Sequence, residues 1–266
     1  MTLPTYELFA IKYAERLGVR RSENFLGGDP HDGPMPMDYF IWVARDGANV
    51  ILIDTGFDAA MAKRRNRSFV REPHEGLALL GIKREDIKTI IITHMHNDHM
   101  GTFFDFPNAK LHIQDTEMAY ATGRCMCHAN LARPYEAEHV GEVVKLVFKN
   151  RVMFHDGEDK IAPGIDVHLI GGHSAGLQAV RVHTKRGWVI LASDSVHYYE
   201  NIETHRCFPV VYHVGQMAEG YDKLNRLAES PNHIVPGHDP LVMKRYPPPS
   251  EDLKGAIVRL DVDPIA

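Results

Sequence analysis

The chain alternates short apolar runs with polar turns along most of its length. Runs of about four to eight residues that are rich in β-branched and aromatic side chains, and that end at glycine, proline or a polar residue, are typical of β-strands. Such runs predict strands at residues 6–13, 40–44, 50–53, 89–93, 110–113, 166–172, 180–183, 188–193 and 233–237. Turn residues separate two pairs of these runs, at Asp46-Gly47 and at Lys185-Arg186-Gly187, so each pair is expected to form a hairpin.

Helical patterns lie between the strands, at residues 59–70, 75–80, 115–122, 140–148 and 215–229. The last of these is amphipathic, because Met217, Tyr221 and Leu224 fall at the spacing of one helix face. Hairpins that are followed by helices fit an α/β fold of four layers, an αββα sandwich with two sheets inside and helices outside. No linker or internal repeat divides the sequence, so we expect one domain over residues 1–266.

The densest group of polar side chains follows one of these strands. After the strand at residues 89–93 the chain reads His94-Met95-His96-Asn97-Asp98-His99, which places four metal-capable side chains within six positions. Imidazoles and a carboxylate that are held together away from water lose hydration and gain little from one another. A bound cation removes this cost, because neutral histidine nitrogens and an ionised aspartate are its natural ligands. A polar, histidine-rich turn is the alternative interpretation.

Three further side chains of the same kind stand at strand ends. His173, Asp194 and His238 each follow a short apolar run. Loops at one edge of a rigid sheet are where functional residues usually gather. A lone histidine beside a strand is more often a surface or capping residue. Several segments that each deliver a histidine or an aspartate at a strand end therefore predict one shared metal site.

Composition and charge exclude several function classes. Apolar residues make up 44% of the chain and charged residues 24%, which is ordinary for a globular protein. The formal net charge of −5 provides no basic footprint for nucleic acid, and we interpret the basic run at residues 63–67 as a solvated helix face. No apolar run approaches the roughly 18–20 residues of a membrane span, and residues 1–7 do not resemble a secretory signal. We therefore expect a cytoplasmic protein with no nucleic-acid or membrane partner.

The pattern His-x-His-x-Asp-His, followed by a distant histidine, an aspartate and a histidine, resembles the signature of the metallo-β-lactamase superfamily. The resemblance extends from about residue 52 to residue 238 and implies the αββα fold. The metal ligands that it implies are His94, His96 and His173 for a first ion, Asp98, His99 and His238 for a second, and Asp194 as the bridge between them. Asp54 would orient a ligand imidazole, or would serve as a turn residue before Gly56.

A site with two metal ions implies hydrolysis, because the ions lower the pKa of a shared water and polarise a carbonyl or phosphoryl oxygen. The resemblance implies attack by a hydroxide that bridges the two ions, with Asp98 placed to move the proton. Since the implied ligands offer only nitrogen and oxygen, we expect two Zn²⁺ ions, with Mn²⁺, Fe²⁺ and Co²⁺ as alternatives.

Within the superfamily the chain is similar to the N-acyl-homoserine lactonases and related bacterial lactonases, through residues 172–176, 192–194 and 237–239. Those lactonases place a tyrosine three residues after the bridging aspartate, where it helps to hold the substrate carbonyl. This chain has His197 at that position, followed by Tyr198. His197 would donate a hydrogen bond in place of the tyrosine or would sit in a polar turn, and Tyr198 would enter the site if the turn is shifted.

The expected reaction is the opening of a lactone ring, in an N-acyl-homoserine lactone or in a catabolic lactone. The partner is thus a small-molecule lactone or ester, and association into a homo-oligomer is left open. A thioesterase like glyoxalase II, and a phosphodiesterase or phosphotriesterase, are alternatives on the same two ions. In superfamily members the stretch that corresponds to residues 115–150 often supplies pocket wall. Its apolar residues would line a substrate cleft or would pack in the core: Met118, Tyr120, Met126 and Leu131, with Met35 and Met37 from the proline-rich loop.

Overall fold

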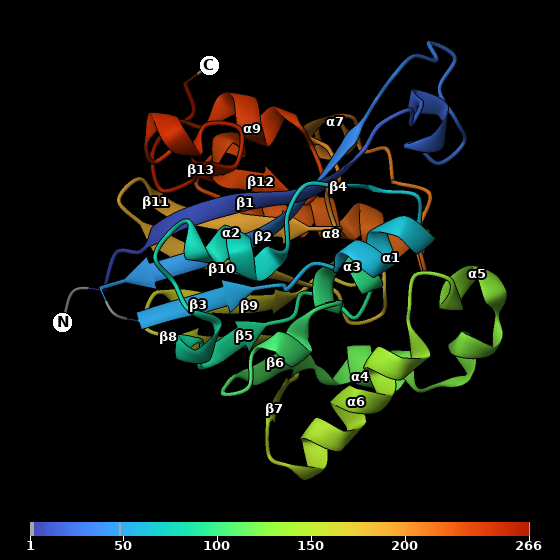
Figure 1. Ribbon diagram of the computed structural model, residues 1–266. Helices are drawn as coiled ribbons and strands as arrows, with labels where there is room; N and C mark the ends of the chain where they lie inside the picture. The colour runs from blue at the N-terminus through green and yellow to red at the C-terminus, as the bar shows by residue number, and fades with distance from the viewer. Residues whose placement is uncertain (1–2, 48, 266) are drawn as a thin grey trace.

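Two β-sheets pack face to face at the centre of the computed structural model, which describes residues 3–47 and 49–265 (Figure 1). In neighbour order, the first sheet within these residues contains β13 (Ile257–Arg259), β1 (Glu7–Arg16), β2 (Met37–Asp46), β3 (Asn49–Ile53), β5 (Thr89–Ile91), β6 (Lys110–Gln114) and β7 (Val152–His155), with β4 (Ser68–Phe69) beside β1. The second sheet, over the same described residues, contains β12 (Ile234–Pro236), β11 (Gly187–Ser193), β10 (Gln178–Thr184), β9 (Ile165–Leu169) and β8 (Glu158–Ala162).

Helices cover the outer face of each sheet. Those beside the first sheet are α1 (Ala59–Arg64), α2 (Pro73–Ala78), α3 (Asn97–Met100), α4 (Asp115–Ala121) and α6 (Ala137–Phe148), whereas α5 (Ala129–Ala132) lies farther from the sheet (Figure 1). The C-terminal half adds α7 (Tyr199–Thr204), α8 (Val214–Leu227) and α9 (Leu241–Arg245). None of the helices in the described ranges combines the length and the apolar character that a membrane span needs.

The alternation of side chains along the strands builds this layered core. In β1, Leu8 and Ala10 face the second sheet, whereas Phe9 and Ile11 face the helices, because successive side chains of a strand point to opposite faces. One buried cluster fills the space between the sheets, a second lies under α1, α2 and α6, and a third lies between the second sheet and α8. The expected αββα sandwich is confirmed.

Most predicted elements are confirmed, including the two hairpins and the amphipathic helix that becomes α8. The helix expected over residues 59–70 is wrong beyond Arg64. The Asp58 carboxylate caps the start of α1 by accepting a hydrogen bond from the Met61 amide, but Asn66 has a left-handed backbone with φ of 54° and ends the helical path. Ser68–Phe69 then pairs with β1 as β4.

Candidate metal centre

The segments that carry the predicted ligands meet where strands of the two sheets end. His94 follows β5 of the first sheet, and Asp194 directly follows β11 of the second. The hydroxyls of Thr93 and Ser193 lie 2.9 Å apart and join these two strand ends. His238 follows β12, which runs parallel to β11 and therefore ends at the same edge.

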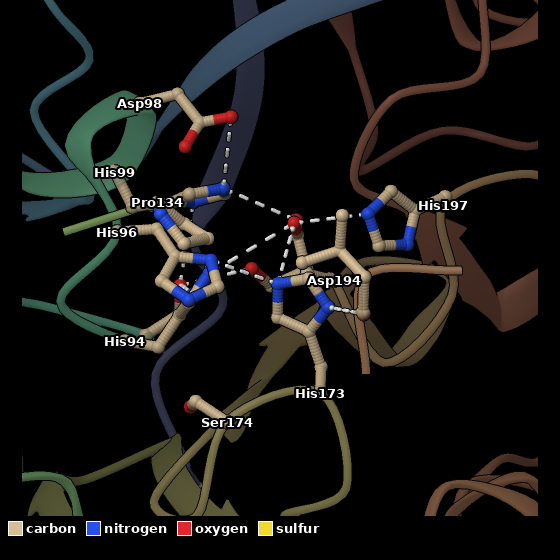
Figure 2. A network of polar contacts seen from close by, with 12 residues as sticks. His94, His96, Asp98, His99, Pro134, His173, Ser174, Asp194 and His197 are labelled. Atoms are coloured by element: carbon tan, nitrogen blue, oxygen red, sulfur yellow. Dashed lines mark hydrogen bonds and ion pairs between the residues drawn. The ribbon is translucent and has the colours of Figure 1, made fainter. Parts of the chain in front are cut away.

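Asp194 lies at the centre of the cluster and is almost fully buried. Its Oδ2 lies 3.8 Å from His94 Nε2 and 3.2 Å from His173 Nε2. Its Oδ1 lies 3.1 Å from His99 Nε2 and 3.0 Å from His238 Nε2. Figure 2 shows the imidazoles of His94, His99 and His173 converging on the carboxylate from separate segments of the chain. The two oxygens of Asp194 thus face two different groups of histidines.

Each group is compact enough for one ion. Possible ligand atoms of His94, His96, His173 and Asp194 all lie within 4.8 Å of one another, and the same holds for Asp98, His99 and His238. Together these seven residues form what we call the candidate metal centre. The structure therefore brings together all seven ligands that the sequence predicts, in the two groups expected, with Asp194 touching both.

Backbone carbonyls orient two of the imidazoles. His173 donates a hydrogen bond from Nδ1 to the carbonyl oxygen of Val210, at 2.7 Å. His238 donates from Nδ1 to the carbonyl oxygen of Asp38, at 2.9 Å. Because a neutral imidazole carries one proton, each of these bonds leaves a lone pair on Nε2 that faces the centre of the cluster. Such partners are typical of histidines that bind metal ions.

Asp54 orients a third imidazole. Its Oδ2 accepts a hydrogen bond from His99 Nδ1 at 2.7 Å, while Oδ1 accepts one from the Thr93 amide at 2.7 Å. Asp54 also occupies a left-handed turn with φ of 58°. The two sequence interpretations of Asp54 are therefore both realised, because the turn is what aims the carboxylate at His99.

The nitrogen and oxygen atoms at the centre fit a divalent cation. His94 Nε2, His99 Nε2, His238 Nε2 and Asp194 Oδ1 are buried and have no hydrogen-bond partner within the described residues. Buried polar atoms without partners are costly and rare in folded proteins. Here they point at one another, so that a cation between them satisfies several at once.

The protonation states of His94, His96 and Asp194 fit as well. Burial, followed by the charge of neighbouring histidines, lowers the pKa of His94 and His96 well below the usual value, so both are neutral ligands at neutral pH. Burial alone raises the pKa of Asp194, but the histidines around it, His238 first, hold that pKa well below its usual range. A neutral imidazole and an ionised carboxylate are the forms that bind metal ions. Burial opposes the charged form of His99 and His238, but the nearby carboxylates, Asp194 first, outweigh burial and raise the pKa of both, so a metal ion would displace a proton there.

His197 lies at the edge of the cluster, in the position expected for it. Its Nε2 lies 3.1 Å from Asp194 Oδ2 (Figure 2). Its ring stacks on Phe208 with centroids 3.6 Å apart. Burial lowers the pKa of His197 to about 4, so the ring is neutral at neutral pH. His197 also lines the cavity beside the candidate metal centre.

The structure does not bring Tyr198 into that cavity, which corrects the sequence prediction. The Tyr198 hydroxyl accepts a hydrogen bond from Asn24 Nδ2 at 3.0 Å, and the ring packs with Met37 and Phe208. The Tyr198 amide donates to Asn201 Oδ1 at 2.8 Å, which fixes the start of α7. Tyr198 is therefore buried against Met37 and Phe208, two residues that line the cavity, and does not line the cavity itself.

Glu117, a residue that the sequence did not single out, joins two ligand loops. One of its carboxylate oxygens accepts hydrogen bonds from the Met95 amide and the Tyr135 hydroxyl, both at 2.8 Å. The other accepts from Ser174 Oγ at 2.7 Å and from the Gly176 amide at 3.0 Å. The approach at Gly176 is so close that a Cβ there would lie 2.1 Å from the Glu117 amide nitrogen, so only glycine fits.

A cavity of about 730 Å³ opens beside the candidate metal centre. Arg133, Pro134 and Glu136 line it and come from the expected pocket segment at residues 115–150, but Tyr120 of that segment packs in the core. Met37 lines it as expected. The remaining lining residues outside the candidate metal centre are Arg16, Glu23, Tyr39, Arg64, Arg65, Arg67, Asn97, His197, Phe208, Pro209 and Val210. The basic run at residues 63–67, interpreted as a solvated helix face, thus places three arginines around the cavity.

An αββα sandwich with paired histidine and aspartate groups at a strand edge defines a class of metal-binding proteins. A model of the Metallo-beta-lactamase superfamily matches residues 36–239, and the chain belongs to this superfamily. The predicted family is therefore confirmed.

Individual relatives share limited sequence identity with this chain. An N-acyl homoserine lactonase of Bacillus cereus is 30% identical over 128 residues, which cover 48% of this chain and 46% of that protein. The chain thus spans about half the length of the curated relative it matches. Among solved structures, a quorum-quenching N-acyl homoserine lactone lactonase aligns with a TM-score of 0.74 and 21% identity over 91% of this chain and 94% of that one. AidC, a dizinc quorum-quenching lactonase, aligns with a TM-score of 0.67 and 16% identity over 90% of each chain. At these identities the structural likeness concerns the fold.

Proposed function

We propose that this protein is a metal-dependent hydrolase that opens lactone rings. The observation that carries the proposal is the placement of Asp194, whose two oxygens face two separate groups of buried histidines. Relatives that share the fold and part of the sequence are named as N-acyl homoserine lactonases, which supports a cyclic ester as substrate.

We assign His94, His96 and His173 to one ion, Asp98, His99 and His238 to the other, and Asp194 to both. Zinc is the expected ion, because the donors are nitrogen and oxygen and because AidC, which shares the fold, is a dizinc lactonase. Two divalent ions bound there supply Lewis acidity toward the scissile carbonyl and lower the pKa of a shared water.

Asp98 is the side chain assigned to proton transfer. Its Oδ2 lies 3.9 Å from both His99 Nε2 and His238 Nε2, and the side chain retains 19% exposure, whereas Asp194 and the histidines around it are almost fully buried. Asp98 also lines the cavity. With Oδ2 facing the position assigned to the second ion, the other oxygen, Oδ1, would take up the proton of the attacking water and return it to the alkoxide that leaves when the ring opens.

His197 is assigned to the carbonyl oxygen of the substrate. The single N–H of its neutral ring, at Nε2, faces Asp194 Oδ2, and the stack on Phe208 fixes the plane of the ring. With both oxygens of Asp194 assigned to metal ions, this N–H would be free to donate to the substrate oxygen. A donor held in one orientation at the cavity wall stabilises the negative charge that develops on that oxygen. His197 thus takes the part expected of the tyrosine that this chain lacks.

A proton-release assay tests the proposal. Zinc-loaded protein is offered acyl-homoserine lactones, simple γ- and δ-lactones and aromatic lactones, with glutathione thioesters and phosphodiesters as controls. We expect turnover of at least one lactone class that disappears when the metal ions are removed and returns when they are restored. Turnover confined to the thioesters or the phosphodiesters would replace the lactone with that substrate class, and turnover that does not depend on metal ions would refute the assigned centre.

A further inference from the structure

Outside the candidate metal centre, the side chains that line the cavity carry more positive than negative charge. Five arginines line it: Arg16, Arg64, Arg65, Arg67 and Arg133. Apart from the candidate ligands, the acidic residues that line it are Glu23 and Glu136. The chain as a whole carries a net charge of −5, so this concentration of guanidinium groups is opposite in sign to the charge of the molecule. Like charges held close together repel one another unless an anion separates them.

Short contacts fix part of this basic group in place. Glu136 accepts hydrogen bonds from Arg64 at 3.3 Å and from Arg65 at 2.6 Å. Arg65 also donates to the carbonyl oxygen of Arg133 at 3.0 Å, and Arg67 donates to the carbonyl oxygen of Arg65 at 2.7 Å. These bonds join the end of α1 to the segment after α5, which lies at the same end of the molecule (Figure 1).

Two of the five guanidinium groups have no carboxylate partner. Arg16 pairs with Glu23, and Arg64 and Arg65 share Glu136. Over residues 3–47 and 49–265, no carboxylate oxygen lies within 4.0 Å of a side-chain nitrogen of Arg67 or Arg133.

Arg67 is close to the candidate metal centre. Its guanidinium carbon lies 5.8 Å from the centroid of the Tyr39 ring. The Tyr39 ring in turn meets the His238 ring with centroids 5.0 Å apart. One aromatic ring therefore separates a guanidinium that has no carboxylate partner among the described residues from a candidate ligand, so that a small molecule held at the centre reaches both.

We propose that the substrate carries an oxyanion, a carboxylate or a phosphate, in addition to the ester bond that is hydrolysed, and that Arg67 and Arg133 bind this anion. The proposal rests on the proposed hydrolase function and specifies its substrate class. A guanidinium presents paired donors that match a carboxylate or a phosphate. A neutral lactone leaves both groups unpaired, whereas an anionic one pairs with them and is drawn into the basic cavity by its charge.

Ring-matched substrates test the inference. Three γ-butyrolactones that differ only in the γ-substituent, a carboxylate, a phosphomethyl group or a neutral carboxamide, are compared on zinc-loaded protein. We expect kcat/KM for at least one anionic lactone to exceed that for the carboxamide by about tenfold or more, mainly through KM. Raising the ionic strength to about 0.5 M should reduce this preference, because added salt screens charges at a partly open cavity.

The variants Arg67→Gln and Arg133→Gln separate these arginines from general charge effects. Each should lose most of the preference for the anion, because kcat/KM for the anionic lactones falls much further than kcat/KM for the carboxamide. Arg226→Gln, on an exposed position of α8, removes the same charge outside the cavity and should change nothing. Folding and zinc content are checked for each variant, and Arg133 is exposed, so its replacement is expected to fold.

The outcomes distinguish the inference from the proposed function. If the carboxamide is opened as efficiently as both anionic lactones, the hydrolase stands and the inference is overturned. A preference that survives in both glutamine variants also overturns the role of these arginines. If no lactone is opened, the proposed function fails. The inference is then decided by calorimetry with the ring-opened dicarboxylate and its monoamide. The dicarboxylate should bind the wild type more tightly than the monoamide does, and the two should bind Arg67→Gln equally. Equal binding of both compounds to the wild type would overturn the inference.

Discussion

Replacing Glu117 with glutamine is expected to loosen the two loops that carry His96 and His173. The buried carboxylate accepts four hydrogen bonds, two from backbone amides and two from hydroxyls. A carboxamide keeps one acceptor oxygen and turns its NH₂ group toward the other pair of donors. A hydroxyl in that pair can rotate and accept instead, but a backbone N–H cannot. In either orientation, therefore, one backbone N–H, of Met95 or of Gly176, is left buried without an acceptor.

The magnitude follows from that single unsatisfied group. A buried donor without a partner costs about 1–3 kcal/mol, so we expect Glu117→Gln to lower the free energy of unfolding by this amount. Because both loops carry ligands of the first group, zinc affinity there should fall about 10- to 100-fold, while the second group, with Asp98, is spared.

Urea unfolding of the metal-free protein measures the stability, and competition with a chelator measures the two zinc affinities. Glu142→Gln, which removes an exposed carboxylate of α6 that pairs only with Lys145 among the described residues, is the matched control and should be neutral. If Glu117→Gln unfolds with the same free energy as the wild type and binds both zinc ions normally, the reasoning is refuted.

Three other outcomes can be measured. Asp54→Asn should lower the binding affinity for the zinc ion assigned to His99 about 10- to 100-fold and leave the affinity for the other ion unchanged, which zinc titration would show. His197→Ala should lower kcat by about tenfold or more with normal zinc content, whereas unchanged kinetics would make this residue structural. Burial lowers the pKa of His112 from 6.5 to about 4, so between these pH values the unfolded chain binds a proton that the folded chain refuses. Stability should therefore fall as the pH drops through that window, by up to about 3 kcal/mol, and His112→Gln should flatten this fall in urea unfolding measured at several pH values.

The candidate ligand set could be predicted from the sequence because each segment that carries these residues begins directly after an apolar run. Runs of this kind identify strands, and strand ends are positions that a sheet brings together. The signature around His94 then supplied the family. The position of Asp54 could be predicted for the same reason, since it directly follows the run that becomes β3.

The position of Tyr198 could not be predicted in this way. The sequence shows how many residues separate Tyr198 from Asp194, but not the path that the backbone takes between them. Hydrogen bonds from the Ser195 and Val196 amides back to residues 192 and 193 set that path, and Asn201 then directs the chain into α7. The side chain consequently points toward Asn24, a residue far away in the sequence.

Glu117 and the cavity arginines were missed for a related reason. The four donors to Glu117 come from residues 95, 135, 174 and 176, so no local pattern marks this carboxylate. The run at residues 63–67 is basic and polar, and such runs usually lie on a solvated helix. Asn66 ends the helical path, and the chain then carries Arg67 over Tyr39 to the cavity. The sequence signal for an earlier end of the predicted helix is Asn66, a turn-forming residue inside the basic run.

Anomalous diffraction at the zinc edge, from crystals of the zinc-loaded protein, tests the central claim most directly. We expect two peaks, one about 2.0–2.2 Å from nitrogen atoms of His94, His96 and His173 and one at a similar distance from His99 and His238, with the carboxylate of Asp194 between them. A single peak, or peaks away from Asp194, in crystals of protein that hydrolyses lactones at its full rate would contradict the assignment of two metal ions to this centre.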